Sequence, residues 1–182
     1  LSADSIRDEK VKVLKSLRRI DRSNVREKTV RGQYTAGFAQ GKKVPGYLEE
    51  EGANKTSNTE TFVAIRVDID NWRWAGVPFY LRTGKRLPTK CSEVVVYFKT
   101  PELNLFKETW QELPQNKLTI RLQPDEGVDI QVLNKVPGLD HKHNLQITKL
   151  DLSYSETFNQ THLADAYERL LLETMRGIQA LF

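Results

Sequence analysis

The chain has 182 residues, of which 38% are apolar and 29% charged, as is usual for a soluble globular protein. The net charge of +4 comes from 28 basic and 24 acidic residues that are interspersed, which argues against a general nucleic-acid surface. No apolar run approaches the roughly 20 residues that span a bilayer, so no membrane partner is expected. The lone cysteine, Cys91, excludes an internal disulfide and favours a reducing, cytoplasmic compartment.

The two ends of the chain predict a fragment of a larger protein. There is no initiating Met, and the closing stretch "RLLLETMRGIQALF" stops within an apolar helical pattern that has no cap and no polar tail. We therefore expect a domain that is incomplete at both ends.

In chain order, the first predicted element is a helix in "SADSIRDEKVKVLKSLRRI", with an apolar face that includes Leu14 and Leu17. Glycine, proline and asparagine then mark loops around one short strand near residues 30–35. Alternation of apolar and other residues predicts further strands. These strands are 61–69, 78–83, 93–99, 117–123, 128–133 and 149–155. A closing helix is predicted from about Asp165, where apolar residues recur at helical spacing.

The connections between the strands decide the fold class. Consecutive strands joined without crossover helices predict antiparallel pairing. The order of helix, strands and helix therefore predicts an α+β fold. In this fold one large, mostly antiparallel β-sheet is covered on one face by helices.

Several common site motifs are excluded. The stretch "FYLRTGKR" lacks the first glycine and the final hydroxyl of a phosphate-binding loop, and no Gly-x-Gly-x-x-Gly occurs. The "HKH" at residues 141–143 has only His162 as a further imidazole and no cysteine pair, so no metal site is expected.

The basic turn at residues 82–90 is the strongest candidate for a site. Arg82 ends one predicted strand, Gly84 permits a bend, and Lys85 and Lys90 flank a loop that contains a proline. Two lysines at this spacing suit an anionic ligand that carries a phosphate and hydroxyls. The alternative is a solvated hairpin tip.

A second candidate lies on the strand at residues 117–123. Arg121 and Gln123 alternate onto one face, and the apolar residues between them alternate onto the other. A long cation and an amide beside a proline turn could line the same pocket as the basic turn. The alternative is an ordinary exposed sheet face.

Five blocks resemble the C-terminal domain of the glucose-6-phosphate dehydrogenase family, in its bacterial form. They are "IRDEKVKVL", "RWAGVPFYLRTGKRLPTKCSEV", "IRLQPDEG", "NKVPG" and "ADAYERLLLE", and their order and spacing match from about Ile6 to Phe182. The resemblance implies that residues 1–182 form a substrate-binding and dimerisation domain. The NADP-binding domain, the catalytic histidine and the main phosphate ligands would then precede Leu1, so no catalytic residue is expected here.

The family's reaction is hydride transfer from C1 of glucose 6-phosphate to NADP, which gives 6-phosphogluconolactone. By resemblance, Lys85 and Gln123 match residues that bind substrate. Lys90 matches a basic residue between substrate and coenzyme. The resemblance also implies a homodimer through the sheet, with NADP held mainly by the missing domain.

Eukaryotic members of the family carry a second, structural NADP in this domain. Arg82 and Arg121 are retained at two positions of that site. The other matching positions depart from it, and they hold Cys91, Val95, Asp129 and Gln131. These changes remove cationic and aromatic contacts and add a carboxylate, so no structural NADP is expected.

Two hypotheses of function remain from the sequence. The first is an enzyme fragment that supplies part of the sugar-phosphate and coenzyme pocket and is inert alone. The second is a non-enzymatic α+β module that binds a polyanion through the basic turn. Uniform basicity with interleaved aromatic residues would favour the second, and the charges are not arranged in that way.

Overall fold

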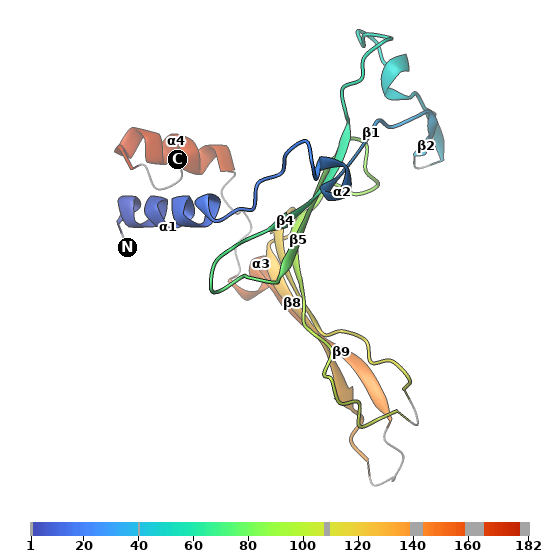
Figure 1. Ribbon diagram of the computed structural model, residues 1–182, viewed down its shortest axis with the longest axis vertical. Helices are drawn as coiled ribbons and strands as arrows, with labels where there is room; N and C mark the ends of the chain where they lie inside the picture. Colours follow the sequence, from blue (N-terminus) through green and yellow to red (C-terminus); the bar gives the residue numbers. More distant parts are fainter. Residues whose placement is uncertain (1, 40, 108–109, 139–143, 159–165, 179–182) are drawn as a thin grey trace. The chain divides into compact units, whose positions relative to one another are not determined.

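A computed structural model describes residues 2–39, 41–107, 110–138, 144–158 and 166–178 (Figure 1). The chain divides into two compact units. The first unit comprises Leu1–Pro88 together with Ala166–Phe182, and the second comprises Thr89–Asp165. No helix in the described part of the chain is long and apolar enough to cross a membrane.

The first unit combines helices with short antiparallel sheets. Its helices are α1 (Ala3–Lys15), α2 (Val25–Lys28), the 3₁₀ turn η1 (Tyr47–Glu49) and α4 (Ala166–Arg176). Its strands are β1 (Thr29–Gly32), β2 (Gly37–Ala39), β3 (Lys42–Val44), β4 (Phe62–Asp68) and β5 (Pro78–Gly84). A three-stranded sheet has the order β1-β4-β5, and β2 pairs with β3 in a separate hairpin.

Local interactions define both ends of helix α1. The Ser2 hydroxyl caps the helix by accepting a hydrogen bond from the Ser5 amide at 3.2 Å. At the other end the Asp70 amide donates to the carbonyl of Ser16 at 2.7 Å. Ile69, which is 7% exposed, forms a bridge with Leu17. The end of α1 is therefore tied to the end of β4.

The second unit is a four-stranded antiparallel sheet with the order β6-β7-β8-β9. Its elements are β6 (Ser92–Tyr97), β7 (Lys117–Gln123), β8 (Gly127–Lys135), β9 (Leu145–Ser153) and the one-turn helix α3 (Tyr154–Thr157). The register places Val96, Leu118, Ile130 and Leu150 in one row across the strands. Because neighbours in a strand alternate, this row belongs to an apolar face and the residues between belong to a polar face.

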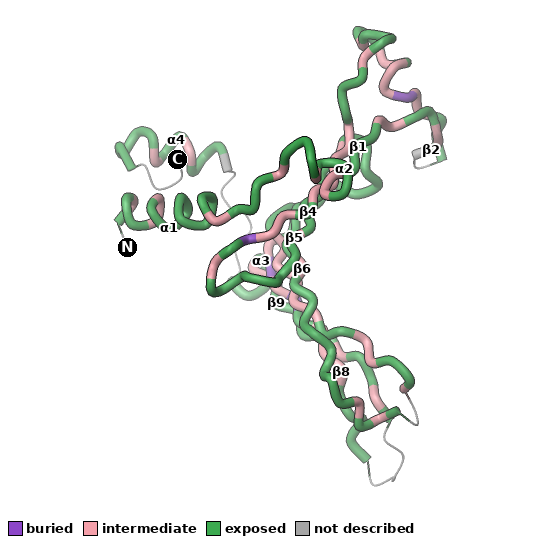
Figure 2. The backbone as a smooth tube through the Cα atoms, viewed as in Figure 1, coloured by how far each residue is buried: buried purple, intermediate pink, exposed green. Residues whose placement is uncertain are grey.

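The apolar face of the second unit is open. Leu150 is 64% exposed and Leu152 is 45% exposed. Figure 2 shows that exposed and half-buried residues dominate both units, and Ile69 is the only apolar residue that counts as buried in the described part. The strands therefore present an apolar surface that neither unit covers within itself.

The α+β class and the antiparallel pairing are confirmed. The described strands form three separate hydrogen-bonded sheets, whereas the sequence predicted one large sheet. Strand β5 is an edge of the first sheet and β6 an edge of the last, and the seven residues 85–91 join them without a hairpin ladder. Pro88 in this connection has no backbone N–H to donate. In the described part, the more extensive helix-to-sheet contacts are made by short helices, α2 on β1 and β4 and α3 on β9, so cover by the long helices stays a prediction.

Candidate functional site

The basic turn begins where β5 ends. Gly84 pairs with Phe62 of β4, and a β-carbon at position 84 would lie 2.9 Å from Phe62 Cδ2, so a side chain there would have to displace the Phe62 ring. The Lys85 amide donates to the Thr61 carbonyl at 2.8 Å. The Lys85 side chain is exposed, and no ion pair involves its ammonium in the described part of the chain. Lys85 is therefore a cation that a ligand could reach. Its backbone is held by the hydrogen bond from its own amide to Thr61.

Arg86, the next residue, is in a different situation. Its backbone has φ +57°, in the left-handed region, and its Nη2 donates to Glu50 Oε1 at 2.5 Å. The Tyr34 hydroxyl donates to the same Glu50 oxygen at 3.1 Å, and the Arg86 guanidinium lies 5.8 Å from the centre of the Tyr34 ring. Hydrogen bonding to Tyr34 and to Glu50 raises the pKa of Arg86 above its ordinary value. We call Tyr34, Glu50 and Arg86 the Arg86 clamp.

Lys90 and Gln123 lie in the second unit, at one end of its sheet. Gln123 is the last residue of β7 and is paired with Ser92, the first residue of β6. Lys90 precedes Ser92 by two residues, and both Lys90 and Gln123 are exposed. The structure thus brings these two predicted residues to the same end of the sheet. Lys85 belongs to the other unit.

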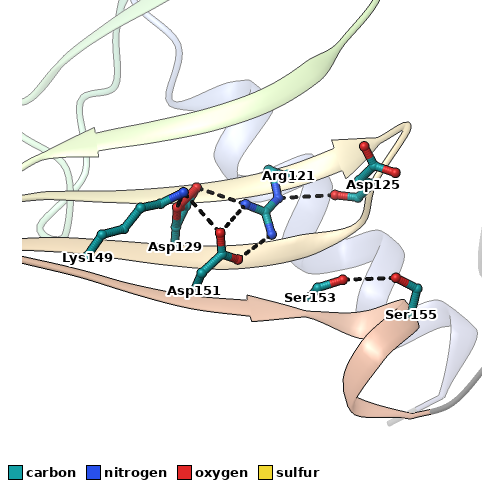
Figure 3. Close-up of polar contacts among 7 residues, drawn as sticks. All are labelled: Arg121, Asp125, Asp129, Lys149, Asp151, Ser153 and Ser155. Atoms are coloured by element: carbon teal, nitrogen blue, oxygen red, sulfur yellow. Dashed lines mark hydrogen bonds and ion pairs between the residues drawn. The ribbon is translucent and has the colours of Figure 1, made fainter.

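Arg121 is engaged on the polar face of the second unit, as Figure 3 shows. Its Nη2 donates to Asp151 Oδ1 at 2.7 Å, its Nη1 to Asp129 Oδ2 at 3.1 Å, and its Nε to the Asp125 carbonyl at 3.2 Å. Lys149 Nζ donates to Asp151 Oδ2 at 3.0 Å. We call Arg121, Asp129, Lys149 and Asp151 the sheet network. Its two cations and two carboxylates balance, so the cluster carries no net charge.

The Asp151 carboxylate of the sheet network is stabilised as an anion. Hydrogen bonds from Arg121 and Lys149 lower the pKa of Asp151 from 3.8 to about 2. Asp129, whose side chain is 12% exposed, has its Oδ1 at 2.6 Å from Lys149 Nζ. No donor reaches this oxygen with hydrogen-bond geometry, yet the ion pair compensates its charge.

Gly127 makes room for the sheet network. A β-carbon at this position would lie 2.5 Å from Arg121 Nη2 and 2.4 Å from the Leu152 carbonyl. Because atoms cannot approach so closely, a side chain at position 127 would displace the guanidinium from its carboxylates. The turn after β7 and the glycine that opens β8 therefore position Arg121 together.

The remaining predicted residues are spread over the two units. Arg82 lies on β5 opposite Ala64, is exposed, and belongs to a different unit from Arg121. The histidines of the excluded metal site, His141, His143 and His162, lie outside the described residues, and no cluster of metal-ligating side chains occurs in the described ones. Sequence reasoning missed Glu50, Asp151 and Lys149, whose partners are 36, 30 and 20 residues away, so only the fold brings them together.

A comparison with protein families decides the assignment. The family described as "Glucose-6-phosphate dehydrogenase, C-terminal domain" matches residues 1–182, the whole chain. The chain belongs to this family. The resemblance recognised in the five sequence blocks is therefore confirmed.

Individual relatives agree with the family. The chain is 86% identical over 182 residues to a glucose-6-phosphate 1-dehydrogenase of Dickeya dadantii, and 55% identical to one of Buchnera aphidicola subsp. Schizaphis graminum. Both alignments cover 100% of this chain and 37% of the relative. The fold is similar, with a TM-score of 0.83 and 36% identity, to a structure described as glucose-6-phosphate dehydrogenase in complex with its substrate glucose-6-phosphate. That alignment covers 100% of this chain and 35% of the other, so the chain spans little more than a third of these relatives.

Proposed function

We propose that this chain is the C-terminal part of an enzyme that oxidises glucose 6-phosphate at C1 with NADP and releases 6-phosphogluconolactone. The observation that carries the proposal is a contrast between cations, in a chain that belongs to this family along its whole length. Lys85 and Lys90 are exposed and have no internal ion pair in the described residues, whereas Arg86 and Arg121 are held by carboxylates. Together with Arg82, which is also exposed and has no ion pair in the described residues, the two lysines are thus the cations of the basic turn that remain for an anionic ligand.

Each residue would have a separate task in the full-length enzyme. Lys85 would donate to the anionic sugar phosphate, and Lys90 would lie between substrate and coenzyme. Gln123 would orient a sugar hydroxyl, because an amide supplies both a donor and an acceptor without charge. These contacts would fix the sugar so that C1 faces the nicotinamide, which lowers the entropic part of the barrier.

The chemical step would belong to residues outside this chain. A general base there would take the proton from the C1 hydroxyl, and bound NADP would supply the acceptor for the hydride of C1, so that the carbon–oxygen bond becomes the lactone carbonyl. The isolated chain lacks that base and is therefore proposed to be inert. The open sheet faces support the further proposal that the enzyme is a homodimer through the sheet.

The test is steady-state kinetics of the full-length enzyme with Lys85→Ala and Lys90→Ala. Each variant should lower kcat/KM by roughly tenfold to a hundredfold, because each removes a charge-assisted contact with the ligand. Gln123→Glu should act in the same direction, since it places a carboxylate beside a phosphorylated ligand.

Lys12→Ala is the control, because Lys12 is 70% exposed on α1 and pairs only with Glu9 in the described chain. Surface pairs of this kind contribute little. Wild-type kinetics in both lysine variants would overturn the proposal and favour a solvated connection between β5 and β6. Salt-dependent binding of a polyanion such as heparin that both lysine variants abolish, without any change in kinetics, would favour the polyanion module.

A further inference from the structure

The Arg86 clamp joins three segments of the first unit that are distant in sequence. Tyr34 follows β1, Glu50 follows η1, and Arg86 follows β5 and Lys85. One carboxylate oxygen of Glu50 accepts from both the tyrosine hydroxyl and the guanidinium. The Glu50 side chain is 28% exposed, so the pair is partly shielded from water. The clamp therefore has more hydrogen bonds, and a less exposed carboxylate, than a solvated surface ion pair.

We propose that Arg86 is a positioning residue, which through this clamp holds the neighbouring Lys85 in place for the anionic substrate. The inference rests on the function proposed above for Lys85. Arg86 itself need not touch the substrate, because its guanidinium is already directed to Glu50 and Tyr34.

The backbone supports this role. On its N-terminal side Lys85 is fixed by the hydrogen bond from its amide to the Thr61 carbonyl at 2.8 Å. On its C-terminal side the chain must pass through the left-handed conformation of Arg86, at φ +57°. A residue with a β-carbon adopts that region only where its surroundings hold it there. The contacts with Glu50 and Tyr34 do so, and without them the Lys85 side chain would start from a less defined backbone.

Removal of the Glu50 charge distinguishes a positioning role of Arg86 from a purely electrostatic one. If Arg86 served only to add positive charge near a phosphate, the carboxylate of Glu50 would oppose it. Glu50→Gln would then lower the KM for glucose 6-phosphate, because a nearby anion is removed. If Glu50 instead holds the clamp, the same substitution raises the KM, because a charge-assisted hydrogen bond becomes a neutral one. The two ideas predict opposite signs.

The experiment is kinetics of the full-length enzyme with Arg86→Ala, Glu50→Gln and Tyr34→Phe. Arg86→Ala and Glu50→Gln should raise the KM for glucose 6-phosphate by roughly threefold to tenfold, with kcat and the KM for NADP within about twofold of wild type. Tyr34→Phe, which removes a single hydroxyl, should have a smaller effect in the same direction. Arg31→Ala is the matched control, since Arg31 pairs with Glu60 at 3.7 Å on the same unit.

A double variant gives the sharpest readout. In the Lys85→Ala background the clamp has no lysine to position, so adding Arg86→Ala should change the KM little, and the two effects should not add. Independent effects that add would overturn the proposal. Melting temperatures identify any variant that fails to fold, and for such a variant Tyr34→Phe carries the test.

The outcomes separate this inference from the proposed function. Wild-type kinetics in Lys85→Ala would overturn the role of Lys85 and with it the clamp. A defect in Lys85→Ala combined with a normal or lowered KM in Arg86→Ala and Glu50→Gln would leave the proposed function standing and overturn the clamp alone.

Discussion

Among the acidic side chains of the described residues, Asp151 has the pKa that is shifted most strongly. Its pKa falls from 3.8 to about 2 because Arg121 and Lys149 hydrogen-bond to its ionised form. A carboxylate whose pKa is lower in the folded chain stabilises the fold above the unfolded pKa, and this stabilisation is lost as the pH falls through the folded pKa. The contribution of Asp151 is therefore complete above 3.8 and disappears towards pH 2.

Acid unfolding of the purified chain checks this expectation. Asp151→Asn should be less stable than wild type at neutral pH, and the difference in melting temperature should shrink between pH 3.8 and about 2. Asp8→Asn on α1 is the control, because Asp8 takes no part in the sheet network. A difference that stays constant over this range would show that the network does not hold Asp151 ionised.

Arg121 leads to a second expectation at the scale of the residue. By the resemblance, Arg82 and Arg121 match two positions of the structural NADP site of eukaryotic relatives, and Asp129 matches a position where that site would have another contact. In the structure the Arg121 guanidinium, which a phosphate would need as a donor, already donates hydrogen bonds to Asp129 and Asp151. We therefore expect no saturable binding below about 100 µM when the purified chain is titrated with NADP in a calorimeter. A tight site that Arg121→Ala abolishes would contradict this.

Among the elements, the sheet of the second unit has the most evident consequence. Its apolar face is open, and surfaces of this kind mark contacts with other parts of a protein or with a partner. In the full-length enzyme we expect Leu150→Asp to dissociate the proposed dimer, because a charge would replace a leucine that is 64% exposed. Gln131→Glu, which adds a similar charge to the polar face of the adjacent strand, is the control.

Analytical ultracentrifugation at micromolar concentration makes the comparison. A dimer that survives Leu150→Asp unchanged would show that the apolar face serves another contact. A monomeric wild type would contradict the proposed dimer itself.

The longer elements were predictable and the shorter ones were not. The alternation at 117–123 gave β7 with its observed bounds, and it placed Arg121 and Gln123 on the polar face as observed. The closing helix, predicted from about Asp165, is present in the described residues as α4, Ala166–Arg176. By contrast β2, β3 and η1 have three residues each, and no period can be recognised in segments of that length.

The start of β9 shows a second limit. The sequence predicted a strand from residue 149, whereas β9 begins at Leu145 and pairs along its whole length with β8. Leu145 and Ile147 fall on the same face as Lys149 and Asp151, so the apolar alternation changes phase before Leu150. Cross-strand hydrogen bonding with β8 extends the strand beyond this break in its pattern. The partnership of Asp151 with Arg121 depends on this register and could not be read from local sequence.

At the scale of the whole molecule, the chain is little more than a third of the relatives that it matches. In the proposed function its described residues supply cations for binding and, by the resemblance, no general base. The purified chain should therefore form no NADPH from glucose 6-phosphate and NADP, in an absorbance assay at 340 nm in which the full-length enzyme is active. Turnover above background, proportional to the amount of purified chain, would contradict the proposed division of labour.

In the candidate site, the lysines could be predicted from the sequence and the partners of the arginines could not. The available lysines, Lys85 and Lys90, were predicted, because a basic turn between strands is a local pattern. The partners that neutralise Arg86 and Arg121 were not predicted, because Glu50 and Asp151 come from distant segments. From the sequence alone, nothing showed that carboxylates hold Arg86 and Arg121.

The space at Gly127 also has a consequence for how this position varies among homologues. Two neighbours require the glycine, the guanidinium of Arg121 and the backbone carbonyl of Leu152. The carbonyl belongs to the paired strand β9, so it stays in place whatever side chain stands at position 121. Homologues that have lost the arginine should therefore still keep glycine at 127. An alignment of the family sorted by the residue at position 121 would reveal whether the glycine is independent of the arginine.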